Sequence, residues 1–147
     1  MVELAVTITI AAILTTVAVP SFTGLIASQR AKTAGSELFA SLLKARSESI
    51  KRNANVTVSP LSGNTNWQSG WQILDPANAA NVLEYHGAVS PVVTGPAAGV
   101  TYRPSGRAVA GGATLFLVTT TAGSSTINQC ISLNLSGRPY MVAASTC

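Results

Sequence analysis

The chain opens with an apolar run that carries a single acid near its start. Residues 4–19 contain no charge, no Gly and no Pro, and the carboxylate of Glu3 is the only charged side chain before Arg30. Counted over residues 2–19, the run gives a helix of roughly 27 Å, which is just long enough to cross the hydrocarbon core of a membrane. The run therefore predicts a helix that is retained as a membrane-spanning anchor.

Two alternatives explain this run less well. A secretory signal peptide has a basic start and a small-residue cleavage site, whereas this run starts with an acid and continues into Pro20, Ser21 and Phe22. A buried core helix accounts for the apolar residues, but not for their lack of polar interruptions in a chain of 147 residues. Pro20 removes one backbone hydrogen bond, so we expect it to kink the helix in the preceding turn.

After the proline, the pattern predicts that the helix continues to about Asn53 as an amphipathic helix. Most charged side chains lie opposite the apolar face, so we expect that charged face to be solvated. Its i,i+4 spacing predicts the ion pairs Lys44–Glu48 and Glu48–Arg52. The apolar face consists of Ala31, Ala34, Leu38, Leu42 and Ala45, widened by Phe39, Leu43 and Ile50.

The two halves together make a predicted helix of about 50 residues, or roughly 75 Å. A compact domain of this size has no use for that length, so the first half is expected to project. We therefore divide the chain into residues 1–26, a membrane anchor, and residues 27–147, a head.

The remainder of the chain has the alternation and turn residues of strands. Gly, Ser, Pro and Asn separate the apolar stretches, and residues 108–113 and 122–125 are expected to be hairpin loops. The predicted fold class is α+β, an antiparallel β-sheet head packed on a long kinked N-terminal helix. The expected strands are 56–59, 70–75, 83–85, 89–94, 100–103, 114–119, 130–135 and 140–142.

The titratable residues are too few to indicate catalysis. The chain has one histidine, five acids and a net charge of +4, and we find no catalytic constellation, cofactor motif or metal-ligand spacing. Its two cysteines, Cys130 and Cys147, are either free thiols or one disulfide, and we favour the disulfide because the anchor indicates export. Closing that loop would stabilise the head by roughly 3 kcal/mol.

Two stretches of the sequence resemble a known family. Met1-Val2-Glu3-Leu4, the apolar run and Val19-Pro20-Ser21-Phe22 resemble the N-terminus of type IV pilins and type II secretion pseudopilins. The stretch "ELFASLLKARSESIKRNANVTVSP", residues 37–60, is similar to the pattern of GspH/FimT family minor pilins and minor pseudopilins. The stretches "VTYRPSGRA" and "CISLNLSGRPYMVAASTC" resemble the family's central turn and closing hairpin, in which Cys130 and Cys147 would staple the last strand.

The resemblance implies a structural subunit of a filament, in which residues 1–26 would form part of the filament core after leaving the membrane. It implies a type IV pilin-like fold, a single pass through the bacterial inner membrane, and a periplasmic head that reaches the filament tip. Its implied partners are other minor pilins or pseudopilins, the major pilin and the inner-membrane assembly platform. It does not separate a type IV pilus from a type II secretion system.

Two residues of the first segment have implied assembly roles. Glu3 would neutralise the terminal amine of the adjacent subunit, and Pro20 would set the usual helix bend. The alternative for Glu3 is a carboxylate favoured only by the helix dipole. The family also has a leader, a Gly cut by prepilin peptidase and a methylated Phe before this segment, and we expect a longer natural chain to supply them.

A second function is suggested by a C-terminal motif. Some FimT-like minor pilins bind DNA during natural transformation through Gly-Arg-x-Arg, and this chain has Gly137-Arg138-Pro139-Tyr140. Tyr140 replaces the second Arg but is able to stack on a base. Arg103 and Arg107 would add charge if the fold brought their turn beside Arg138. The alternative, which we favour, is that Arg138 is a turn residue whose guanidinium caps a carbonyl.

Overall fold

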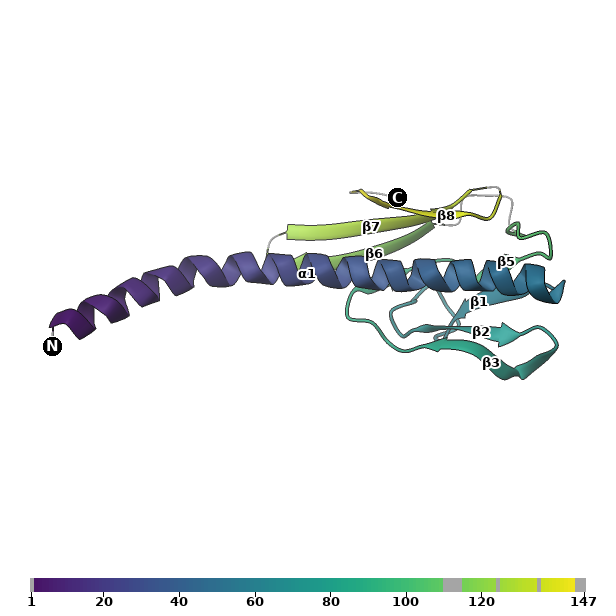
Figure 1. Cartoon of the computed structure of the whole chain (residues 1–147), viewed down its shortest axis with the longest axis horizontal. Helices are drawn as coiled ribbons and strands as arrows, with labels where there is room; N and C mark the ends of the chain where they lie inside the picture. The colour runs from purple at the N-terminus through teal and green to yellow at the C-terminus, as the bar shows by residue number, and fades with distance from the viewer. Residues whose placement is uncertain (1, 110–114, 124, 135, 145–147) are drawn as a thin grey trace.

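One long helix runs through the molecule. The computed structural model describes the chain except residues 1, 110–114, 124, 135 and 145–147, and residues 16–21, 115 and 125 by their backbone alone. Helix α1 spans Val2–Arg52 without interruption. Its first part projects from the rest of the molecule and curves gradually away (Figure 1). We call residues 2–26 the stem and the described residues from Ala27 onward the head.

The expected end of the helix near Asn53 is confirmed. Lys51 and Arg52 lie in the last turn, where cations favour the helix dipole. Asn53 adopts a left-handed conformation with φ of 50°, and the amide of Ala54 donates to the carbonyl of Ser49 at 3.2 Å. This is a helix C-cap, in which Asn takes the place more often held by Gly. The backbone around Pro20 remains helical. No bend is defined there, so the expected kink stays a prediction.

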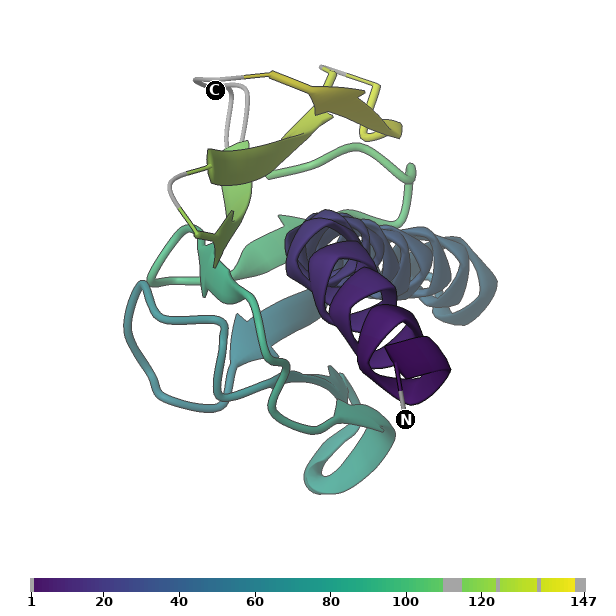
Figure 2. The ribbon, with the colours of Figure 1, turned by 90° about the vertical axis from the view of Figure 1, so that its left-hand side faces the viewer.

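The head contains eight strands in two antiparallel sheets, whereas the sequence led us to expect one sheet. One sheet has the order β3-β2-β1-β5 and the other β4-β6-β7-β8. The two sheets lie on different sides of α1 in Figure 1, and the view along the helix shows them gathered around one part of its circumference (Figure 2). The strands are β1 (Val56–Pro60), β2 (Trp71–Asp75), β3 (Asn78–His86), β4 (Val92–Thr94), β5 (Val100–Tyr102), β6 (Leu115–Ala122), β7 (Ser125–Leu133) and β8 (Pro139–Ala143).

Both sheets share one apolar core with the helix. The predicted apolar face is confirmed for Leu38, Leu42 and Ala45, which are fully buried. Its expected widening is wrong at Leu43 and Ile50, which are 39% and 54% exposed. The loop residue Trp67 joins the two sheets: its ring packs edge-to-face on Phe116 of β6 at 4.7 Å. Other fully buried members of the core are Ala31, Val56, Val58, Trp71, Ile73, Val93, Tyr102, Val118 and Ile131.

A buried polar contact fixes the β2–β3 hairpin to the helix. The indole N–H of Trp71 donates to the hydroxyl of Ser41 at 2.9 Å, and that hydroxyl donates to the carboxylate of Glu84. The Trp71 ring stacks on His86 with 4.1 Å between centroids, and His86 lies 3.2 Å from the Glu37 carboxylate. These buried polar groups of Trp71 and Ser41 are thus hydrogen-bonded.

Candidate functional site

The stem presents apolar side chains to its surroundings. The large apolar residues of the stem whose side chains are described are 48% to 78% exposed. The threonine hydroxyls do not interrupt this surface, because they donate to carbonyls of their own helix: Thr7 to Leu4 at 2.9 Å and Thr9 to Ala5 at 2.7 Å. Such internal bonds satisfy the hydroxyls without water. The exposed residues are Val2, Leu4, Val6, Ile8, Ile10, Ile13, Leu14, Phe22, Leu25 and Ile26.

Glu3 is exposed in the first turn of this helix. There the helix dipole favours its negative charge, which agrees with both interpretations of the residue. Within the residues that the structure describes, no helix has a segment long and apolar enough to cross a membrane.

The head brings together two turns that are distant in sequence. In the first turn, the amide of Gly106 donates to the carbonyl of Arg103 at 2.8 Å, and Gly106 has φ of 73°. In the second, the amide of Gly137 donates to the carbonyl of Asn134 at 2.9 Å, and Gly137 has φ of 78°. A Cβ built on Gly137 would lie 2.3 Å from the Gly106 carbonyl oxygen and 3.1 Å from the Cα of Arg107. The two turns therefore touch backbone to backbone, and we call them the arginine turns.

The arginine turns place their cations at one end of the head. The side chains of Arg103, Arg107 and Arg138 are exposed, as is Tyr140 at 48%. Asn134, rather than the guanidinium of Arg138, closes the second turn, since its side-chain oxygen accepts from the amide of Arg138 at 2.8 Å. We favoured a bond from the Arg138 guanidinium to a backbone carbonyl, but the described residues show no such hydrogen bond.

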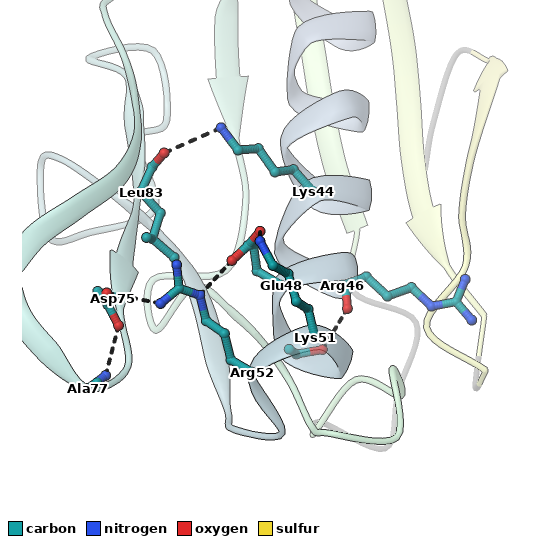
Figure 3. A network of polar contacts seen from close by, with 9 residues as sticks. Lys44, Arg46, Glu48, Lys51, Arg52, Asp75, Ala77 and Leu83 are labelled. Atoms are coloured by element: carbon teal, nitrogen blue, oxygen red, sulfur yellow. Dashed lines mark hydrogen bonds and ion pairs between the residues drawn. The ribbon is translucent and has the colours of Figure 1, made fainter.

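Arg46 adds a fourth cation that the sequence did not assign to this site. Its Nε donates to the carbonyl of Gly106 at 3.0 Å and so holds the first arginine turn against the helix. In Figure 3 its side chain points away from Glu48, toward the part of the chain drawn in yellow. The only signal in the sequence was that Arg46 broke the division of the helix into apolar and charged faces.

The head's carboxylates lie elsewhere. Lys44 pairs with Glu84 of β3 at 2.9 Å, so the predicted Lys44–Glu48 pair is wrong. The predicted Glu48–Arg52 pair is confirmed at 2.5 Å, and Arg52 also reaches Asp75 at 3.0 Å (Figure 3). The charged face of the helix is exposed at Arg30, Lys44 and Lys51, as expected. It also makes ion pairs with β2 and β3.

These pairs set the electrostatics of the head. The bond from the Arg52 guanidinium holds the pKa of Glu48 below its usual value. The same bond raises the pKa of Arg52. With Glu37 at His86, all four carboxylates outside the stem are engaged between α1 and the β2–β3 hairpin. The ion pairs of these side-chain carboxylates lie within α1 or between α1 and the β2–β3 hairpin, and not at the arginine turns.

Of the two cysteines expected to form a disulfide, only Cys130 belongs to the residues that the structure describes. Cys130 is buried on β7, while Cys147 is outside the described residues, so their disulfide remains a prediction. Among the described residues, no group of three or more His, Cys, Asp or Glu side chains is placed to hold a metal ion.

Comparisons with known proteins agree with this architecture. Two crystal structures of the type IV minor pilin FimU from Pseudomonas aeruginosa match the chain with TM-scores of 0.64 and 0.65, at 22% and 23% identity. The matches cover 79% and 86% of this chain and 98% of each FimU chain. At this identity they show the fold alone, which is that of a type IV pilin. No curated protein matches the sequence. The family model described as type II transport protein GspH matches residues 34–137, most of the chain, and the protein therefore belongs to the GspH family.

Proposed function

We propose that the protein is a minor pilin or pseudopilin that helps to initiate or cap a type IV pilus or a type II secretion pseudopilus. The observation that carries this proposal is the stem, whose exposed aliphatic side chains lie outside the core of the head. A water-exposed apolar surface of this kind marks an interface with lipid or protein. In this proposal the stem first anchors the subunit in the inner membrane as a single pass, and the head lies in the periplasm.

The same stem then leaves lipid and packs among the helices of other subunits. Glu3 favours a position beside a positive charge in this step, because a carboxylate moved into an apolar bundle is costly unless a cation pairs with it. The partner in this proposal is the terminal amine of the adjacent subunit. Its neighbours are other minor subunits, the major pilin and the inner-membrane assembly platform.

Charge reversal of Glu3 tests this proposal. In cells that carry the pilus or secretion system, Glu3→Lys is expected to abolish filament assembly or secretion, and Glu3→Asp to retain it. Both variants are compared for membrane content and for the fold of the head, so that loss of assembly is not mistaken for loss of protein. Normal piliation and secretion with Glu3→Lys would remove the proposed role of the stem.

A second candidate function is DNA binding during uptake, and the contact between the arginine turns favours it. Gly106 and Gly137 bring Arg103, Arg107 and Arg138 to one end of the head. Clustered guanidinium groups bind phosphates and release counterions, while Tyr140 offers a ring for stacking.

Salt-dependent binding tests the second candidate. The full chain in detergent is titrated with a labelled DNA duplex at low salt and again at rising salt. Arg138→Ala is expected to weaken binding and to make the salt dependence shallower by about one charge. Arg30→Ala removes an exposed arginine from the helix and serves as the matched control. Absence of binding at low salt, or equal losses in the two variants, would eliminate this function.

A further inference from the structure

The outer edge of β8 carries apolar side chains. β8 is the last strand in the order β4-β6-β7-β8, and no described strand pairs with its other side. Tyr140, Met141 and Val142 are 48%, 37% and 51% exposed. An edge strand of this kind has unpaired backbone groups that are able to pair with another chain.

The register shows which groups of β8 face outward. The amide of Asn134 donates to the carbonyl of Arg138 at 3.2 Å, and the ladder continues with Ser132 opposite Tyr140 and Cys130 opposite Val142. Hydrogen-bonded pairs alternate along an antiparallel ladder. Tyr140 and Val142 therefore bond to β7, and Met141 and Ala143 direct their N–H and C=O groups outward.

A groove lies beside this edge. It has a volume of about 600 Å³ and lies between the helix residues Ser36 and Phe39 and the β8 residues Tyr140 and Met141. β8 approaches the helix closely, because a Cβ on Gly35 would lie 2.9 Å from the sulfur of Met141. A strand added to the edge would continue the sheet over the helix and place alternate side chains on Phe39 and Met141.

The positive charge of Arg138 determines the expected orientation of the added strand. Arg138 lines the same groove at the start of β8, and its turn contacts the turn of Arg103 and Arg107. The carboxylates of the head are held at β2 and β3. A strand antiparallel to β8 ends beside Arg138, so a carboxylate at its C-terminal end would lie close to the exposed guanidinium of Arg138.

We propose that the β8 edge accepts an extended segment of another filament subunit by strand addition. The segment lies antiparallel to β8, has apolar side chains at alternate positions, and carries a carboxylate near its C-terminal end. Backbone bonds to Met141 and Ala143 give affinity, while the groove and Arg138 select the sequence. The identity of the partner as a subunit rests on the proposed function, but binding at this edge is measured without filament assembly.

A synthetic peptide tests the edge directly. The probe is a fluorescent peptide of alternating Val and Thr that ends in Glu, titrated against the full chain in detergent. Ala143→Pro removes an outward N–H and is expected to weaken binding about tenfold, while Ala143→Ser keeps that N–H and binds as the parent does. Arg138→Gln is expected to weaken the Glu-ending peptide more than a Gln-ending peptide.

A change in the peptide controls for misfolding of the variants. Methylating the backbone nitrogens that face β8 is expected to abolish binding to the unaltered protein. Equal binding of the methylated and unmethylated peptides, or of Ala143→Pro and Ala143→Ser, would overturn the proposal. Binding of labelled single-stranded DNA in place of the peptide would also overturn it and would assign this face to nucleic acid. Normal assembly with Glu3→Lys would count against the filament role, while the peptide result would stand.

Discussion

Replacing Gly137 with alanine should destabilise the head by more than its backbone conformation alone requires. Gly137 has φ of 78°, and a Cβ there would lie 2.3 Å from the carbonyl oxygen of Gly106. The left-handed conformation costs a non-glycine residue about 1–2 kcal/mol, and forcing two backbones apart adds about 1–3 kcal/mol. We therefore expect Gly137→Ala to lower the free energy of unfolding by about 3 kcal/mol.

Gly63 provides the matched control. It has φ of 68°, but a Cβ there would meet nothing within 4 Å, so Gly63→Ala carries the conformational cost of about 1–2 kcal/mol alone. The buried Trp67 and Trp71 report unfolding of the head by fluorescence, measured in denaturant with the full chain in detergent. A difference of about 2 kcal/mol corresponds to about 4–8 °C in Tm. Losses that agree within about 0.5 kcal/mol would refute the tight contact between the arginine turns.

Three further changes probe the head. Ser41→Ala leaves the buried indole N–H of Trp71 without its acceptor, and should cost about 1–3 kcal/mol in the same denaturant experiment; an unchanged midpoint would contradict this. The buried hydroxyl of Tyr102 has no hydrogen-bond partner in the described part of the chain, and burial raises its pKa, so Tyr102→Phe should change stability by less than about 0.5 kcal/mol or increase it. Since Arg52 lowers the pKa of Glu48, the stability that Glu48 contributes is present above its unfolded pKa of about 4.3 and is lost as pH falls through the lower folded value. Denaturant curves of Glu48→Gln and the parent should therefore differ near neutral pH and converge in strong acid, and a constant difference would show that this carboxylate is not linked to folding.

Local sequence patterns predicted the positions of the helix and strands better than the contacts between these elements. The helix was visible because apolar spacing and a C-terminal Asn are local signals. The beginnings of β3 and β7 were missed, since Asn78 to Asn81 and Ser125 to Asn128 are small or polar residues typical of loops. They form strands because hairpin partners supply their hydrogen bonds, which no local signal shows.

The errors at the site have the same origin. The rule for i,i+4 pairs assigned Lys44 to Glu48, but β3 folds beside the helix and brings Glu84 closer. The resemblance implied a central turn and a closing hairpin in the stretches that contain Gly106 and Gly137, and both residues have positive φ. Their contact with each other depends on the pairing of strands that are far apart in sequence, as does the division into two sheets.

Because α1 is continuous, the length of the stem affects the rotation of the head about the helix axis. The helix passes from one to the other without a break, and each residue turns it by about 100° and advances it by about 1.5 Å. Adding one residue to the stem would rotate the whole head by more than a quarter of a circle relative to the start of the stem. Adding about seven, close to two full turns, would nearly restore the original bearing. The length of the stem thus sets the orientation of the head about the helix axis.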